Sequence, residues 1–294
     1  MSLPTPDVRA AYSLRRDLRA DLERFRDRGS PTGVFLVNLA DAVDLSAVPP
    51  TPPSNADRVG ATTALAAAQA AINRAIGEMV AYEAEGGGAL FQDMVPCREL
   101  RVTQTSLGSG VPLEIHTEQA FSDLRPDFLS LACLRGDPDA KTYTLHVRQI
   151  LDGVDAREAE LLRRPLWTVG VDASFVASGL VSAATRGPVA IVSGTDDDPT
   201  LVFDQDLMRG VTAEAEALRL KVVDVYLARR REHALRPGDV LLVDNMRAVH
   251  GRSAFRARFD GTDRFIVRSF VVRDLARSAH ARDGESRTVL AAFS

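Results

Sequence analysis

Apolar residues recur with helical spacing in the first part of the chain. Residues 9–28 place them three and four positions apart, which predicts an amphipathic helix. The alanine-rich stretch 57–85 predicts a second helix, which the glycines 86–88 would end. Between these helices, the short apolar run 33–39 is typical of a buried strand. The proline-rich residues 49–53 indicate an extended connection on the surface.

After residue 88 the pattern changes to short apolar blocks separated by turn residues. These blocks predict β-strands at residues 89–95, 111–118, 128–134, 142–148, 189–193, 240–243 and 264–272. One long helical pattern, residues 212–234, interrupts them. Many short strands with few helices favour a β-sandwich or jelly roll over a doubly wound α/β sheet. We therefore expect a mainly β fold with flanking helices.

Composition then limits the class of protein. Hydrophobic residues make up 45% of the chain and charged residues 26%, as in globular proteins. The net charge is −4 and no basic block is present, which argues against binding of nucleic acid. The sequence shows neither a run of about 20 apolar residues nor a secretory signal. We expect a cytoplasmic protein without a membrane partner, in which Cys97 and Cys133 are too few for a disulfide framework.

Candidate metal ligands lie at the end of a predicted strand. Residues two positions apart on a strand point to the same face, so His116 and Glu118 would project side by side. A solvated strand end is the alternative for this short motif taken alone. His250 follows the predicted strand 240–243 and could complete a set of two histidines and one carboxylate. Such a set leaves coordination positions open and suits non-haem Fe(II).

Two further pairs of charged residues share a strand face. Arg264 and Arg268 lie four apart in an apolar strand, where buried guanidinium groups need anions and could bind two carboxylates. The alternative is that one or both face solvent at a sheet edge. Asp204 and Asp206, if extended, could hold a cationic group between them. A polar turn and a divalent-ion site are the alternatives for this acidic pair.

Two motifs together resemble the clavaminate synthase-like family of Fe(II)/2-oxoglutarate oxygenases. The first motif is HTEQAFSDLRPDFL at 116–129, and the second is VHGR at 249–252 followed by DGTDR. The resemblance covers roughly residues 80–275. It implies a double-stranded β-helix, or jelly roll, over that range. Residues 1–294 would then form a single oxygenase domain whose N-terminal part, 1–85, is helical.

The resemblance also implies how the metal and the cosubstrate are bound. The residues that match the family's iron ligands are His116, Glu118 and His250. Arg264 matches the arginine that binds the distal carboxylate of 2-oxoglutarate. Thr142 matches a threonine that contacts the same cosubstrate, and its same-face neighbour Thr144 is the alternative.

The substrate residues carried over from the family describe a pocket for an amino acid. Arg268 matches the arginine that binds the substrate α-carboxylate, and Gln92 is similar in place to a glutamine near the amino group. Asp204 and Asp206 resemble an acidic pair that holds the guanidinium group in arginine hydroxylases. Asparagine hydroxylases also use an acid in this region. We therefore expect a free L-amino acid as the small-molecule substrate, with arginine first, lysine second and asparagine or another neutral amino acid third.

The reaction implied is the hydroxylation of an unactivated C–H bond with Fe(II), 2-oxoglutarate and O₂. A zinc-type metallohydrolase could use the same three ligands, but it leaves Arg264 and Arg268 without a role. A non-catalytic jelly-roll binding protein is a further alternative, and the intact set of metal ligands counts against it. The oligomeric state, the carbon attacked and the choice between hydroxylation and desaturation stay open.

Overall fold

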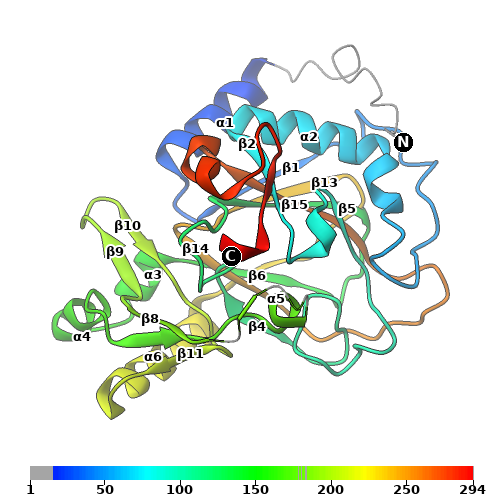
Figure 1. The fold of residues 1–294 in the computed structure, drawn as a ribbon. Coiled ribbons are helices and arrows are strands. Elements are labelled where there is room, and N and C mark those ends of the chain that lie inside the picture. Colours follow the sequence, from blue (N-terminus) through cyan, green and yellow to red (C-terminus); the bar gives the residue numbers. More distant parts are fainter. Residues whose placement is uncertain (1–15, 178, 180, 183, 294) are drawn as a thin grey trace.

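Two β-sheets, antiparallel except where β16 pairs with β2, form the core of the computed structural model, which describes residues 16–293 except 178, 180 and 183 (Figure 1). The larger sheet has the strand order β1 (Val34–Asn38), β13 (Asp239–Asp244), β5 (Phe128–Arg135), β15 (Phe265–Val272), β2 (Glu78–Tyr82) and β16 (Thr288–Val289). The short strand β3 (Gln92–Met94) also pairs with β15. The smaller sheet has the order β12 (Arg231–His233), β6 (Thr142–His146), β14 (Ala248–Arg252) and β4 (Leu113–His116). Side chains from both sheets line a cavity between them.

Two helices cover the outer face of the larger sheet. They are α1 (Arg16–Arg28) and α2 (Ala64–Ile76), which lie side by side above it in Figure 1. The side chains of strand β15 alternate between the two faces of the sheet, so one set of them faces the helices. Val267 and Val271 pack with Leu22 of α1 and Ile72 of α2, whereas Ile266 belongs to the core on the other face.

The remaining helices and strands lie beside the smaller sheet, whereas the 3₁₀ turns η1 (Val59–Thr62) and η2 (Gly86–Gly88) contact the larger one. The helices are α3 (Val147–Leu151), α4 (Ala156–Leu162), α5 (Ala173–Ala177) and α6 (Ala213–Arg229). The strands are β7 (Trp167–Val169), β8 (Arg186–Val189), β9 (Val192–Gly194), β10 (Pro199–Leu201) and β11 (Met208–Gly210). Further 3₁₀ turns are η3 (Leu275–Ala281) and η4 (Ala291–Phe293). Trp167 is fully buried and its Nε1 donates to the Ala215 carbonyl at 3.1 Å, which holds α6 against β7.

The mainly β jelly roll with flanking helices is confirmed, and the strands predicted at 128–134, 240–243 and 264–272 are present. Helix α1 occupies the described part of 9–28, and residues 9–15 lie outside the described residues. The helix predicted over 57–85 is wrong at both ends, because the 3₁₀ turn η1 precedes α2 and β2 follows it. A Cβ atom on Gly77 would lie 2.3 Å from the Val272 carbonyl oxygen, so glycine lets the chain turn against β15.

Other predicted elements are shorter than expected. Strand β6 ends at His146, whose Nδ1 accepts a hydrogen bond from the Arg148 amide at 3.1 Å and so caps α3. The helix predicted at 212–234 ends at Arg229, because the chain then joins the smaller sheet as β12. The block 89–95 contains only the three residues of β3, and 189–193 is divided between β8 and β9.

Among the described residues, no helix combines the length and apolar character needed to cross a bilayer.

Candidate active site

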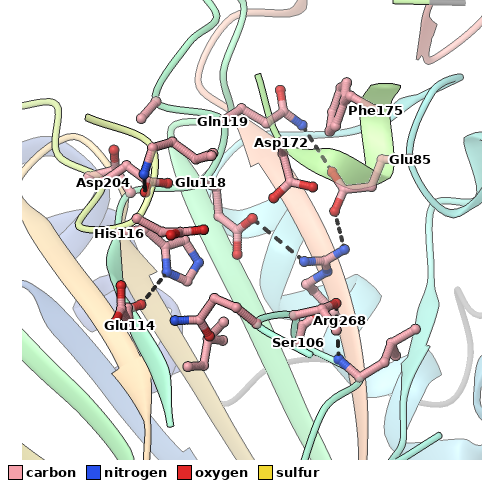
Figure 2. A pocket seen from close by; sticks show the side chains of 18 of the residues that line it. Glu85, Ser106, Glu114, His116, Glu118, Gln119, Asp172, Phe175, Asp204 and Arg268 are labelled. Carbon is pink, nitrogen blue, oxygen red and sulfur yellow. Dashed lines mark hydrogen bonds and ion pairs between the residues drawn. The ribbon is translucent and has the colours of Figure 1, made fainter. Parts of the chain in front are cut away.

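Two histidines and a glutamate meet at the edge of the smaller sheet. His116 ends β4 and lies directly opposite His250 of β14, with 4.3 Å between the ring centroids. Glu118 comes two residues after His116 and points into the same space (Figure 2). One potential ligand atom from each of the three residues lies within 4.8 Å of the others. The three side chains could therefore hold one metal ion.

The main chain at Glu118 is fixed by a buried asparagine. The Glu118 amide donates to Asn245 Oδ1 at 2.8 Å, and Asn245 Nδ2 donates to the Glu118 carbonyl at 3.2 Å. The same Nδ2 donates to the Pro126 carbonyl at 2.8 Å. Because Asn245 follows β13 directly, the larger sheet holds the segment that carries Glu118.

The protonation states suit a metal cation. Burial alone would raise the pKa of Glu118, but the charge of Arg268 and the hydrogen bond with His250 lower it to about 2. Burial and the neighbouring His116 lower the pKa of His250, which favours its neutral form. Nδ1 of His116 donates to the Glu114 carbonyl at 2.8 Å, which leaves Nε2 free to bind. An ionised carboxylate and neutral imidazoles are the forms that bind divalent iron.

A cavity beside these three residues carries positive charge. Thr142 and Arg264 line it together with the apolar side chains of Leu129, Leu131 and Ile266. Arg264 is 7% exposed, burial lowers its pKa, and it forms no ion pair with the described residues. The buried hydroxyl of Thr142 also has no hydrogen-bond partner among them.

Thr144, the alternative to Thr142, already has a hydrogen-bond partner. Its hydroxyl lies 3.0 Å from Nε2 of His233 on β12. Thr142 is therefore the threonine whose hydroxyl is available to a ligand in the cavity beside Arg264.

A second cavity adjoins the first and contains the guanidinium group of Arg268. This group forms ion pairs with Glu85 and with Glu118, the latter at 3.6 Å (Figure 2). Gln92 lies opposite Arg268 on β3, and its Oε1 accepts a hydrogen bond from Nη2 of Arg268. Burial raises the pKa of Glu85, and Gln119 Nε2 donates to its other oxygen at 3.2 Å. Gln92 thus contacts the arginine that the sequence predicts to bind the substrate carboxylate.

Acidic side chains surround the rest of this second cavity. Apart from Glu118 they are Glu85, Glu114, Asp172, Asp204 and Asp206. Asp204 is half-buried next to β4, and burial raises its pKa to about 6. Asp206 is exposed. Several carboxylates around one cavity attract a cation, because their charges otherwise repel each other.

The structure brings all nine predicted residues to the two adjoining cavities. The second, acidic cavity is lined by Gln92, Asp204 and Asp206. The first cavity is lined by Thr142, His250 and Arg264. Both are lined by His116, Glu118 and Arg268. Their chemical roles stay predictions.

Sequence reasoning missed Glu85, Asp172, Asn245 and Arg252, which also lie at this site. Glu85 was placed at the end of a predicted helix. The available signal was the glycine triplet, because Gly86 has φ 56° and a Cβ atom there would lie 2.6 Å from Gln92 Cδ. This close approach places Glu85 beside Gln92, so that both side chains contact Arg268.

Comparison with known proteins gives consistent matches. Residues 182–270 match the taurine catabolism dioxygenase TauD, TfdA family. The chain is 56% identical to L-lysine 3-hydroxylase of Catenulispora acidiphila, over 84% of this chain and 70% of that protein. It is 31% identical to clavaminate synthase 2 of Streptomyces clavuligerus, over 94% of this chain and 84% of that protein.

A solved structure shows the same fold with ligands present. Asparagine oxygenase in complex with Fe(II), 2S,3S-3-hydroxyasparagine and succinate aligns with a TM-score of 0.87 and 31% identity, covering 96% of this chain and 89% of that chain. The jelly roll and the cluster of His116, Glu118 and His250 agree with these similarities to known oxygenases. The chain belongs to the clavaminate synthase-like amino-acid hydroxylases of the TauD/TfdA family of Fe(II)/2-oxoglutarate-dependent dioxygenases.

Proposed function

We propose that this hydroxylase acts on free L-lysine, at carbon 3, with Fe(II) bound by His116, Glu118 and His250. The observation that carries the proposal is a His–Glu–His cluster beside an acidic cavity that holds one buried arginine. When bound, iron and 2-oxoglutarate supply the oxidising chemistry: O₂ and 2-oxoglutarate are consumed, succinate and CO₂ are released, and one oxygen atom enters a C–H bond. The protein determines which C–H bond faces the metal.

Arg264 and Thr142 are assigned to the cosubstrate. The single cavity that they line reaches His116, Glu118 and His250. The distal carboxylate of 2-oxoglutarate fits these two groups, because among the described residues the buried guanidinium of Arg264 lacks a carboxylate partner and the buried hydroxyl of Thr142 is free. The apolar side chains between them and the metal site fit the methylene groups of the same molecule.

Arg268 and Glu85 are assigned to the α-carboxylate and α-ammonium groups of the substrate. Arg268 and Glu85 already pair with each other. A zwitterionic amino acid can replace this ion pair with two, one between its carboxylate and Arg268 and one between its ammonium group and Glu85. Gln92 holds the guanidinium of Arg268 from the adjacent strand. Because Arg268 lies 3.6 Å from Glu118, the α-end of the substrate is anchored next to a metal ligand. The carbon one bond beyond the α-carbon, carbon 3, is then close to the metal.

The remaining acids are assigned to the cationic end of the side chain. Asp204 and Asp206 line the same cavity as Arg268, with Asp172 and Glu114 nearby (Figure 2). An ammonium or guanidinium group would neutralise part of this negative charge, whereas the asparagine side chain would not. The 56% identity to L-lysine 3-hydroxylase favours lysine over arginine.

A substrate panel tests this proposal. The protein is incubated with Fe(II), 2-oxoglutarate and O₂ and, separately, L-lysine, L-arginine, L-ornithine and L-asparagine. We expect L-lysine to gain one oxygen atom at carbon 3, in amounts equal to the succinate formed, as measured by mass spectrometry and NMR. Preferred hydroxylation of arginine would contradict the choice of lysine, and preferred hydroxylation of asparagine would contradict the cation-binding cavity. Hydrolysis supported by Zn²⁺ without succinate release would favour a metallohydrolase.

A further inference from the structure

Arg252 is a buried arginine for which neither the predicted site nor the proposed function gives a role. It lies on β14 two residues after His250, on the same face, and is 4% exposed. Its side chain donates to two backbone carbonyls, from Nε to Ser253 at 3.2 Å and from Nη1 to Ser106 at 3.0 Å. Its third nitrogen, Nη2, is buried and has no hydrogen-bond partner among the described residues.

The charge around Arg252 is uncompensated. Among the described residues that line its cavity, Glu118 is the one acid, and it pairs with Arg268. In the described part of the chain, Arg252 and Arg264 therefore share this buried space without a carboxylate that pairs with either of them. Two buried cations of this kind are costly unless an anion lies between them.

The neighbours of Arg252 define where such an anion would bind. Thr142 lies directly opposite Arg252 across β6 and β14, and its buried hydroxyl is also without a partner. The ring of Phe255 lies 5.1 Å from the guanidinium carbon of Arg252. Three groups in one cavity thus lack an anionic partner: the hydroxyl of Thr142, Nη2 of Arg252 and the guanidinium of Arg264.

We propose that Arg252 is a second guanidinium group that binds the distal carboxylate of 2-oxoglutarate, together with Arg264 and Thr142. A carboxylate has four lone-pair positions and can accept from all three groups at once. This inference rests on the proposed function for the identity of the cosubstrate. It does not depend on which amino acid is hydroxylated.

The test compares two keto acids that differ only at the distal end. Isothermal titration calorimetry is performed under anaerobic conditions on the Fe(II)-loaded protein without an amino acid. The ligands are 2-oxoglutarate and 2-oxopentanoate, which lacks the distal carboxylate. We expect Arg252→Gln to weaken 2-oxoglutarate about tenfold to a hundredfold, the value of a charge-assisted hydrogen bond, and to leave 2-oxopentanoate unchanged. Arg252→Lys should recover part of the loss, because it keeps the charge without the planar fork.

A purely structural role would give a different result. Because Arg252 also holds the Ser106 carbonyl, its loss could disturb the cavity wall, and both keto acids would then weaken equally. The inference is overturned if the ratio of the affinities for 2-oxoglutarate and 2-oxopentanoate in Arg252→Gln and in Arg252→Lys equals that of the wild-type protein. Thermal unfolding by circular dichroism confirms that each variant is folded, and Arg252→Lys alone carries the comparison if the glutamine variant is not.

A matched variant and the wild-type protein complete the test. Arg219→Gln removes another buried arginine, one that pairs with Glu216 away from this cavity, and should change neither affinity. Wild-type protein that does not bind 2-oxoglutarate would overturn the proposed function together with this inference. Wild-type protein that shows the expected ratios but does not hydroxylate lysine would overturn only the proposed substrate.

Discussion

Asn245 shows how one buried amide prepares the metal site. It makes three hydrogen bonds, two with the main chain of Glu118 and one with the Pro126 carbonyl. We expect Asn245→Ala to lower the free energy of unfolding by about 1–3 kcal/mol, because buried polar groups lose their partners. It should also weaken Fe(II) binding, because Glu118 is no longer fixed. Urea denaturation and anaerobic Fe(II) titration measure the two effects.

The control for this prediction is Asn38→Ala. Asn38 makes side-chain hydrogen bonds with Pro237 and Asp239 at the edge strand β1, where part of the surface is exposed. This variant should leave Fe(II) affinity unchanged. If Asn245→Ala is destabilised but binds Fe(II) like the wild-type protein, Asn245 does not position Glu118.

The two aspartates of the acidic cavity should differ in importance. Asp204 is half-buried beside β4, whereas Asp206 is exposed and its charge is screened by water. We expect Asp204→Asn to raise the KM for lysine at least about thirtyfold, because loss of one partner of a desolvated pair costs about 2–5 kcal/mol. Asp206→Asn should have a smaller effect. Steady-state kinetics with lysine varied measure both.

The KM for 2-oxoglutarate serves as the internal control in both variants, because neither aspartate lines the cavity assigned to the cosubstrate. A larger effect at Asp206 than at Asp204 would mean that the cationic end of the substrate lies toward the opening of the cavity. An unchanged KM for lysine in both variants would contradict the role of this acidic pair.

At the scale of elements, strand β15 connects the two proposed ligand sites. Arg264 immediately precedes it and Arg268 lies within it, and both line the cavity of Thr142 together with Ile266. The pairing with β5 shifts at Phe265 and Ile266, where one extra residue is accommodated in β5. The side chains of β15 itself still alternate regularly, so the two arginines keep one face.

This arrangement predicts separate effects of two substitutions. Arg264→Leu should mainly raise the KM for 2-oxoglutarate, because Arg264 lies in the cavity with Thr142. Arg268→Leu should mainly raise the KM for the amino acid, because Arg268 lies beside Glu85 in the acidic cavity. Steady-state kinetics with each ligand varied in turn provide the measurement. Equal effects on both ligands in both variants would contradict the assignment.

Local patterns predicted those parts of the site that lie on single strands. Arg264 and Arg268 share a face because side chains alternate along a strand. His116 and Glu118 reach the same space, although β4 ends at His116 and Glu118 lies in the turn after it. Prediction failed where tertiary pairing overrides local preference, as in residues 77–85. There an alanine-rich pattern favours a helix, but pairing with β15 produces strand β2.

At the scale of the whole molecule, the site joins residues that are distant in the sequence. His250 and Glu118 are 132 positions apart, and Arg268 and Glu85 are 183 positions apart. No local spacing predicts such contacts, and the resemblance to a known family supplied the first pair. It did not supply the second, because the sequence predicts a helix up to Glu85 where the structure has strand β2. Facing sheets bring both pairs to the same two cavities.

Anaerobic titration of the metal-free protein with Fe(II) tests the assignment of His116, Glu118 and His250 most directly. The wild-type protein should bind one Fe(II) per chain, and its thermal unfolding temperature should rise with Fe(II) concentration because the metal binds the folded state. His250→Ala should lose this binding, whereas His280→Ala, which removes a histidine next to Phe293 that lines neither cavity, should retain it. Stoichiometric Fe(II) binding by His250→Ala with wild-type affinity would contradict the proposed metal site.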